Sequence, residues 1–310
     1  DLLRMYWDQG LRYQFFQPIT VPLPFSQGEQ TIGEDIRISG RAGLKLSLDA
    51  ATFYSNDRDP QVPSGGAVRQ FSLYTTGHYG DGVDPTLYSL QFGSIASNFY
   101  MSEGWLRWQG IDYVHNVQVG YETVPQTLEN IYSFGTLTFM EASSMSLAFS
   151  PGNRLGVEAF RTFDNERLRV SDPGLNGGSV TQTFLYPVVR VTGLPVLADN
   201  GKDGVELVHL GMSVGYQFAK GSQFTYQSRP ESFIAPYLVD TGEIAADQAS
   251  LVGLEAIYMH GPFTLTGEVA ATHLKGESQS TNFWGGYVSA GYFLTGEQRG
   301  YNKNTGALVG

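Results

Sequence analysis

Three basic residues recur at intervals of four positions near the start of the chain. Arg37, Arg41 and Lys45 occupy odd positions of a segment in which apolar and polar residues alternate. In an extended strand they would lie on one face, about 13 Å apart. Along a water-filled passage, such a series would offer passing anions successive partners that replace part of the hydration shell. The alternative is that these long side chains only solvate a wet surface.

Acidic residues oppose a strong attraction of anions. The chain carries 19 Lys+Arg against 30 Asp+Glu, a net charge of −11, which is unlike the charge balance of a nucleic-acid-binding protein. Several acids also fall on the polar faces of predicted strands, where they would cancel much of the field of the basic series. The sequence therefore predicts a mild preference for anions. These acids are Glu122, Glu158, Glu255 and Glu268.

The remaining reactive residue types do not indicate catalysis. Residues 211–215 read GMSVG, which matches the GxSxG pattern of a hydrolase nucleophile elbow, but that motif needs a sharp strand-to-helix turn. Ser213 lies instead in the middle of a clean alternation, so we predict that the protein is not an enzyme. The five histidines show no HxxxH or HExxH spacing and cysteine is absent, so neither a metal site nor a cofactor is expected.

These side chains must be positioned by strands, because a period of two residues dominates the sequence. From 35 to 50 the even positions are apolar or small and the odd positions are mostly polar, and similar alternation returns at 208–218 and 263–269. No convincing amphipathic helix of normal length is found. About a dozen strands are predicted between turn-forming residues. They cover residues 35–54, 67–79, 85–97, 103–109, 113–123, 154–164, 166–171, 180–192, 206–218, 222–229, 250–259, 262–275 and 282–294.

Composition favours strands that cross a membrane. Charged residues make up only 16% of the chain, aromatic residues 13%, and glycine occurs 38 times. A tilted strand of about 9–11 residues spans the hydrocarbon, and aromatic residues near strand ends are typical of its interfaces. No apolar run is long enough for a transmembrane helix. We therefore predict an all-β fold, a transmembrane antiparallel β-barrel, with a soluble all-β fold as the alternative.

Three groups of short segments resemble one protein family. They are similar to the "FMER…P-x-R-x-x-G", "R-x-TGLP…HLG" and "FLTGE-x-R-x-Y" stretches of the phosphate-selective porin O/P family, in the same order. The family's second strand opens with several arginines, whereas this chain has one, Arg69, and its "FMER" ends here in Ala142. The matching segments are TFME at 138–141 with PGNRLGV at 151–157, RVTGLP at 190–195 with HLG at 209–211, and FLTGEQRGYN at 293–302 with TG at 305–306.

The resemblance implies an outer-membrane porin of a diderm bacterium, a sixteen-stranded and homotrimeric barrel surrounded by membrane lipid and lipopolysaccharide. It would allow passive diffusion of small hydrophilic solutes, with anions such as phosphate favoured. A non-selective general porin is an alternative, and so is a mainly structural barrel that acts as a partner in an envelope complex. Residues 1–310 would form a single porin domain.

The long segment 124–153 follows the fifth predicted strand. In porins the third external loop, between strands five and six, folds into the lumen and narrows it. By this analogy, the segment is expected to be a constriction loop, since a connection of this length favours a function. Its candidate residues are Glu129, Asn130, Tyr132 and Glu141. The alternative is a surface loop or a contact between subunits.

The number of strands leads to one further expectation. Sixteen strands are implied by the resemblance, but about a dozen are found before Gly310. An open sheet edge in lipid would leave backbone N–H and C=O groups unsatisfied. We therefore expect further strands beyond residue 310, and an incomplete barrel within these residues, in which the strand near 282–294 does not pair with the one near 35–54.

Overall fold

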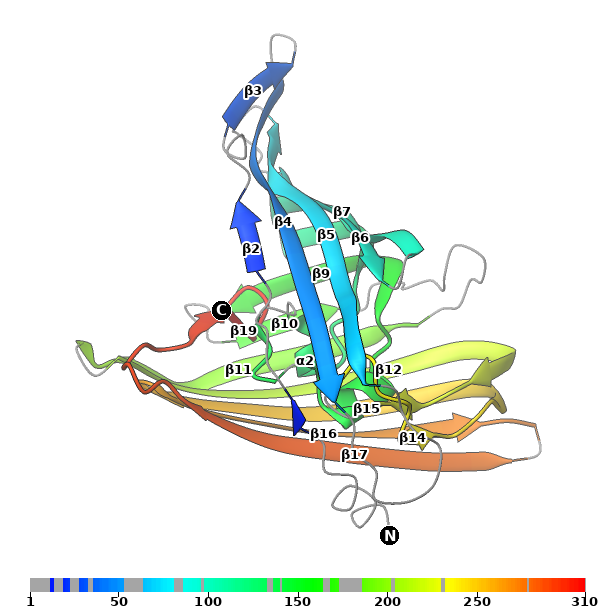
Figure 1. Ribbon diagram of the computed structural model, residues 1–310. Coiled ribbons are helices and arrows are strands. Elements are labelled where there is room, and N and C mark those ends of the chain that lie inside the picture. The colour runs from blue at the N-terminus through cyan, green and yellow to red at the C-terminus, as the bar shows by residue number, and fades with distance from the viewer. Residues whose placement is uncertain are drawn as a thin grey trace.

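One large antiparallel sheet dominates the computed structural model (Figure 1). The structure describes residues 12–13, 19–22, 28–32, 36–52, 64–80, 86–95, 98–132, 136–139, 141–163, 168–172, 186–201, 204–229, 232–277 and 279–309. None of the helices in these ranges is long and apolar enough to cross a membrane.

The sheet has fifteen strands, and from β4 to β17 its long strands follow each other in sequence order as an antiparallel meander. This meander comprises β4 (Ile36–Thr52), β5 (Gly65–Gly80), β6 (Thr86–Ile95), β7 (Asn98–Ile111), β8 (His115–Thr123), β9 (Asn153–Phe163), β10 (Leu168–Asp172), β11 (Val188–Asp199), β12 (Val205–Phe224), β15 (Ile244–His260), β16 (Phe263–Lys275) and β17 (Ser280–Tyr292).

Shorter strands complete the list. Three of them pair with the other edge of β4: β1 (Arg12–Tyr13), β2 (Ile19–Pro22) and β3 (Gly28–Ile32). Two small separate sheets are formed by β13 (Gln227–Ser228) with β14 (Val239–Asp240), and by β18 (Gly300–Asn302) with β19 (Ala307–Val309).

The predicted strands differ from the observed ones in several places. The predicted strand 206–218 and the first part of 222–229 form one long strand, β12, which shifts register against β15 between Phe218 and Ser222, while Gln227–Ser228 form the separate β13. Gly221 has φ +71, so the residues that resemble a turn form a bulge inside the ladder. β15 already begins at Ile244 and not at 250. β11 extends to Asp199, whereas part of its predicted range, 180–185, lies outside the described residues.

The two faces of the sheet differ in chemistry. Along β15 from Ala249 to Met259, odd positions are buried, and even positions such as Val252 and Leu254 are exposed. β12 and β16 repeat the pattern, with polar residues such as Ser213 and Thr266 buried on the concave face. An apolar outer face and a mixed polar inner face are what a bilayer requires, and this confirms the alternation predicted for these strands.

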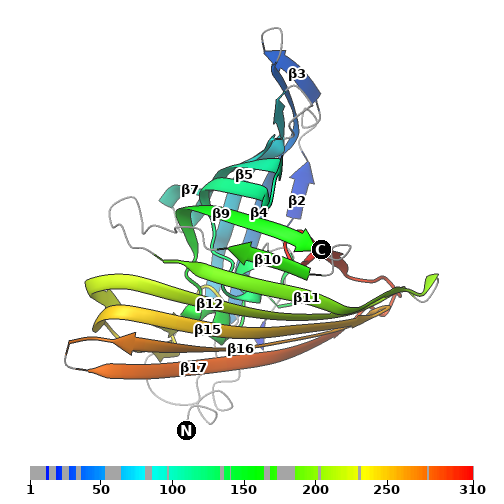
Figure 2. The same ribbon diagram turned by 180° about the vertical axis from the view of Figure 1, so that it is seen from behind.

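The sheet curves strongly but does not close within the described residues. Figures 1 and 2 show β11 to β17 stacked side by side across the base, while β4 and β5 rise at an angle to them. β17 pairs with β16 over its whole length, and no ladder among the described residues joins it to β4. The expected further strands remain a prediction.

The connections divide the sheet into a short-turn end and a long-loop end. At the short-turn end, residues 112–114 join β7 to β8, and residues 261–262 join β15 to β16. The long-loop end carries the connection 124–152 between β8 and β9 and the connection between β12 and β15, which includes β13 and β14. Because its connections are longer, the long-loop end offers more residues from which a functional site could be built.

The alternation of β4 can be tested with single thiols, because the native chain has no cysteine. We expect Lys45→Cys and Ser47→Cys to react with a membrane-impermeant thiol reagent, and Leu44→Cys and Leu46→Cys to resist it. A register slip by one residue would place Lys45 in hydrocarbon, at a cost of about 2–4 kcal/mol near the midplane. Equal labelling at positions 45 and 46 would contradict the assignment of faces.

Candidate functional site

The segment between β8 and β9 folds onto the concave face of the sheet. It contains two short helices, α2 (Leu128–Ile131) and α3 (Ser144–Phe149). The backbone N–H of Leu128 donates to the Glu268 carboxylate of β16 at 2.8 Å. The Ser213 hydroxyl of β12 donates to the carbonyl oxygen of Gln126 at 2.5 Å. The segment thus reaches strands far from its own ends.

Apolar packing holds both helices against the sheet. Leu128 is completely buried in a cluster that includes Leu207 of β12 and Ile257 of β15. From α3, Met145 and Phe149 pack against the inner face of β15 and β16. Because these partners lie on the side of the sheet opposite the exposed apolar face, the helices occupy the interior of the curve.

Side-chain hydrogen bonds fix the loop's own shape. The Ser143 hydroxyl accepts from the Ser146 N–H and caps α3. Asn130 donates to the Val124 carbonyl at 2.9 Å and accepts from the Ser150 hydroxyl at 2.5 Å, so it joins the two ends of the loop. The Glu129 carboxylate accepts from the Ser143 N–H at 2.7 Å. Two of the predicted loop residues therefore position the loop itself.

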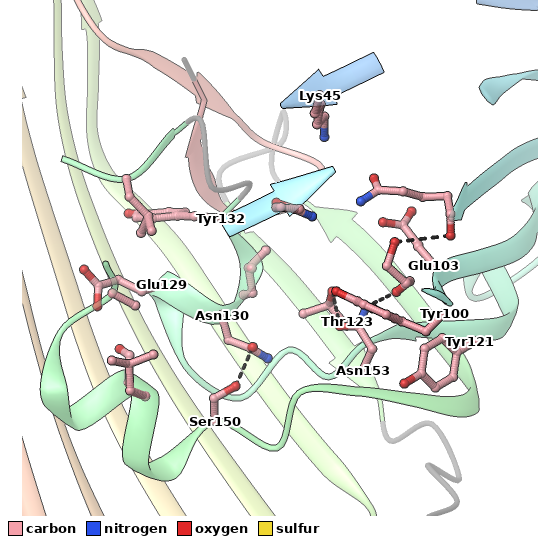
Figure 3. A pocket seen from close by; sticks show the side chains of 18 residues that line it. Lys45, Tyr100, Glu103, Tyr121, Thr123, Glu129, Asn130, Tyr132, Ser150 and Asn153 are labelled. Carbon is pink, nitrogen blue, oxygen red and sulfur yellow. Dashed lines mark hydrogen bonds between the residues drawn. The ribbon is translucent and has the colours of Figure 1, made fainter. Parts of the chain in front are cut away.

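A cavity of about 580 Å³ lies between this loop and the wall formed by β4 to β8 (Figure 3). Four residues singled out from the sequence line it together: Lys45 from the wall, and Glu129, Asn130 and Tyr132 from the loop. Figure 3 shows Lys45 projecting into it from β4, opposite the loop. The Lys45 ammonium lies 5.1 Å from the centroid of the Tyr74 ring. Burial raises the pKa of the Tyr132 hydroxyl well above its ordinary value, which keeps this side chain neutral.

Glu141, the fourth predicted loop residue, is not among the cavity-lining residues and pairs with Arg69 of β5. The Arg69 Nε lies 2.8 Å from one carboxylate oxygen, and its terminal nitrogen donates to the other at 3.1 Å. The guanidinium also lies 4.5 Å from the ring centroid of Phe233, in the connection between β12 and β15. Burial raises the pKa of Glu141, and the nearby Arg69 opposes this. Glu141 thus tethers the loop to the wall.

The other two members of the basic series are only partly described. Arg37 and Arg41 lie in β4, where their backbones pair with Gly80 and Thr76, but their side chains lie outside the described residues. Lys45 pairs with Ser72 in the same ladder. The backbone thus supplies the predicted spacing along one strand, and one member of the series is seen at the cavity.

A buried ionic network lies deeper on the concave face. The Arg190 side chain of β11 is completely buried and donates to both carboxylate oxygens of Glu255, at 2.5 and 3.3 Å. The His209 imidazole lies between the Glu255 carboxylate, at 2.7 Å, and the Tyr301 hydroxyl, at 2.6 Å. Glu255, expected to face an open lumen and weaken its field, is instead covered and paired with a cation.

The same network explains the segments on which the family resemblance rests. Arg190 also donates to the carbonyl oxygens of Thr305 and Gly306, at 2.8 Å each. Gly306 has φ +62, and a Cβ there would lie 2.9 Å from the Thr192 hydroxyl, so glycine is required. RVTGLP, HLG and FLTGEQRGYN thus meet at one place, where they hold the β18–β19 hairpin against the sheet.

One hydrogen bond extends this arrangement to the loop, since Arg299 donates to the Thr138 hydroxyl at 2.7 Å. The sequence identifies these segments as matches to the family but does not predict that they contact each other. The property that could have indicated these contacts is the presence of charged or polar residues, such as Arg190 and His209, at inward positions of the strands.

Two of the other acids predicted to face inward also accept hydrogen bonds. Glu268 accepts from the Leu128 N–H, and Glu122 accepts from the Gln118 amide. Arg107 of β7 donates to Gln118 at 2.5 and 2.8 Å, which places a cation beside this acid. Some of the acids that were expected to cancel the field of the basic series therefore bind the loop or neighbouring side chains of the wall.

A curved antiparallel sheet with an apolar outer face and a mixed polar inner face defines the class of transmembrane β-sheet proteins. The chain belongs to the phosphate-selective porin O and P family, whose family model matches residues 42–309. This membership places the protein in the outer membrane. The family resemblance predicted from the sequence is confirmed.

One relative can be described. An uncharacterized protein of Caulobacter vibrioides is 29% identical over 203 residues, which cover 60% of this chain and 40% of that protein. The chain thus spans well under two thirds of the length of that relative.

The Arg190–Glu255 pair is expected to be essential for stability. Arg190→Met leaves the Glu255 carboxylate buried without its cation, which should cost about 3–5 kcal/mol. The measurement is the temperature at which the purified folded protein loses its compact form on a gel. Arg190→Met with Glu255→Gln should recover part of the loss, and Glu206→Gln, at a partly exposed acid, should change little. Wild-type stability of Arg190→Met would contradict this role.

Proposed function

We propose that the protein forms an outer-membrane pore for passive diffusion of small hydrophilic solutes, with a preference for anions such as phosphate. The observation that supports this proposal best is the cavity between the wall of β4 to β8 and the inward-folded loop. Lys45 projects into this cavity. A polar passage bounded by a loop on one side and a strand wall on the other is a filter, and it needs no chemical step.

The anion preference rests on the basic series of β4. Lys45 brings a cation to the cavity, and Arg41 and Arg37 follow four and eight residues earlier on the same strand. Cations spaced about 13 Å apart would act one after another on an anion that moves along the wall. Because field lines are focused in a narrow passage with low-dielectric walls, even a few charges change the local concentration of ions.

A second candidate, a non-selective pore, is favoured by the acids at the same cavity. Glu103 of β7 and Glu129 of the loop both line it. Two carboxylates near one ammonium weaken the attraction of a doubly charged anion. We therefore propose only a mild preference for anions. A structural barrel that conducts no current would contradict the proposed pore.

The proposed setting follows from the two ends of the sheet. Outer-membrane barrels have short turns on the periplasmic side and longer extracellular loops. We accordingly assign the long-loop end to the cell exterior and the short-turn end to the periplasm. Lipid and lipopolysaccharide would surround the apolar outer face, and assembly as a homotrimer is part of the proposal.

The basic series can be tested by charge removal. We expect Arg37→Gln/Arg41→Gln/Lys45→Gln to shift the reversal potential of single channels, under a salt gradient, toward cation preference without unfolding the protein. The matched control is Lys220→Gln, which removes a positive charge at an exposed position near the end of β12. A reversal potential that stays at the wild-type value in the triple variant would leave the series as solvation of the wall only.

The constriction can be tested by volume. Tyr132→Ala removes a large side chain from the lining of the cavity, so we expect a higher single-channel conductance. Tyr113→Ala is the control, because Tyr113 is 89% exposed in the turn between β7 and β8. If both variants conduct like the wild type, the loop does not limit the current.

A further inference from the structure

The groups that line the cavity are mostly neutral. Its charged members are one ammonium, Lys45, and two carboxylates, Glu103 and Glu129. A phosphate dianion is held best by several cationic or N–H donors, and the two carboxylates would repel it. The other polar lining groups are hydroxyls and side-chain amides, which serve a neutral partner equally well as donors and acceptors.

Two of the side-chain amides at the cavity come from the wall. Gln70 of β5 and Gln91 of β6 both line it, and the Gln91 amide makes a long hydrogen bond, 3.5 Å to the Ser72 hydroxyl. Gln91 stands opposite Glu103 in the next strand, whose carboxylate binds Trp105 through one oxygen. A carboxamide presents a donor and an acceptor side by side, so it can hold two neighbouring hydroxyl groups.

Aromatic rings supply the second half of such a site. Tyr100 and Tyr121 line the wall side of the cavity, and Tyr132 lines the loop side. Amphipathic rings of this kind offer an apolar surface and a polar edge to the same ligand. Small-molecule sites combine apolar walls with a few placed polar groups in volumes of about 300–1,000 Å³, and this cavity of about 580 Å³ fits that description.

We propose that this cavity is a binding site for a neutral, polyhydroxylated solute of the saccharide class. Gln70, Gln91 and Glu103 bind hydroxyl groups, and the tyrosine rings pack against the C–H faces of the sugar. The inference rests on the proposed pore, because the solute must reach the cavity through it. It goes beyond that function, since ion preference set by the basic series does not require a solute site.

The test is saturable block of single-channel current by maltose, with a polyethylene glycol of similar size as the comparison. We expect maltose to block the wild-type current at saturable occupancy, and the glycol to lower it only in proportion to concentration. Gln91→Ala should raise the half-blocking concentration of maltose about tenfold, as expected for a lost hydrogen-bonding partner. Gln217→Ala, an inward glutamine of β12 outside the cavity, should leave it unchanged.

Several results would overturn the site. They are a maltose block that never saturates, a Gln91→Ala channel with wild-type block, or saturation by inorganic phosphate where maltose has no effect. If Gln91→Ala does not fold, Tyr100→Leu takes its place, because it removes the ring and hydroxyl but keeps apolar volume.

If the wild-type protein conducts no current, the site is tested separately in detergent. Maltose is then added stepwise while the tryptophan fluorescence of the protein is measured. Trp105 is bonded to Glu103 and reports on the cavity. A saturable change there supports the site while the pore function fails, and no change refutes the site as well.

Discussion

The constraint on which this architecture depends is that backbone N–H and C=O groups find no water in hydrocarbon. Each must be paired by the next strand, which explains why β4 to β17 form one continuous meander with ladders as long as the strands themselves. Once the strands are paired, successive side chains of each strand point to opposite faces of the sheet, so the apolar set can face lipid in only one orientation. Apolar residues such as Leu254 and Val269 point outward, and polar residues such as Ser213 and Thr266 are directed to the concave side.

Polar groups directed to the concave side must in turn be hydrogen-bonded, either to water or to other groups of the protein. Here part of the face is covered by the loop at 124–152 and by the β18–β19 hairpin, which supply partners to several of the buried polar groups. Arg190 makes four hydrogen bonds, two to Glu255 and two to backbone carbonyls of the hairpin. A buried ion pair adds little stability relative to an apolar replacement, but breaking it is costly, and its geometry fixes which segments dock.

Much of the sheet could be predicted from the sequence because alternation is a local signal. The outward and inward positions of 208–218 and 263–269 follow from it, and the loop after the fifth strand follows from its length. The continuity of β12 could not be predicted, since Lys220 and Gly221 resemble a turn until β15 pairs with both sides of the bulge. Pairs such as Arg69 with Glu141, 72 residues apart, depend on the curvature of the whole sheet and leave no local trace.

In the proposed pore, the charges and the neutral groups would act at different ranges. The basic series lies along β4, where it would act on any ion through the field. The side-chain amides and tyrosines of the cavity would act only in contact, where the loop approaches the wall. Glu103 and Glu129 line that same cavity, where they oppose the attraction of anions by Lys45. A solute held there would therefore be recognised by hydrogen bonds and ring contacts, while the basic series would set which ions accompany it.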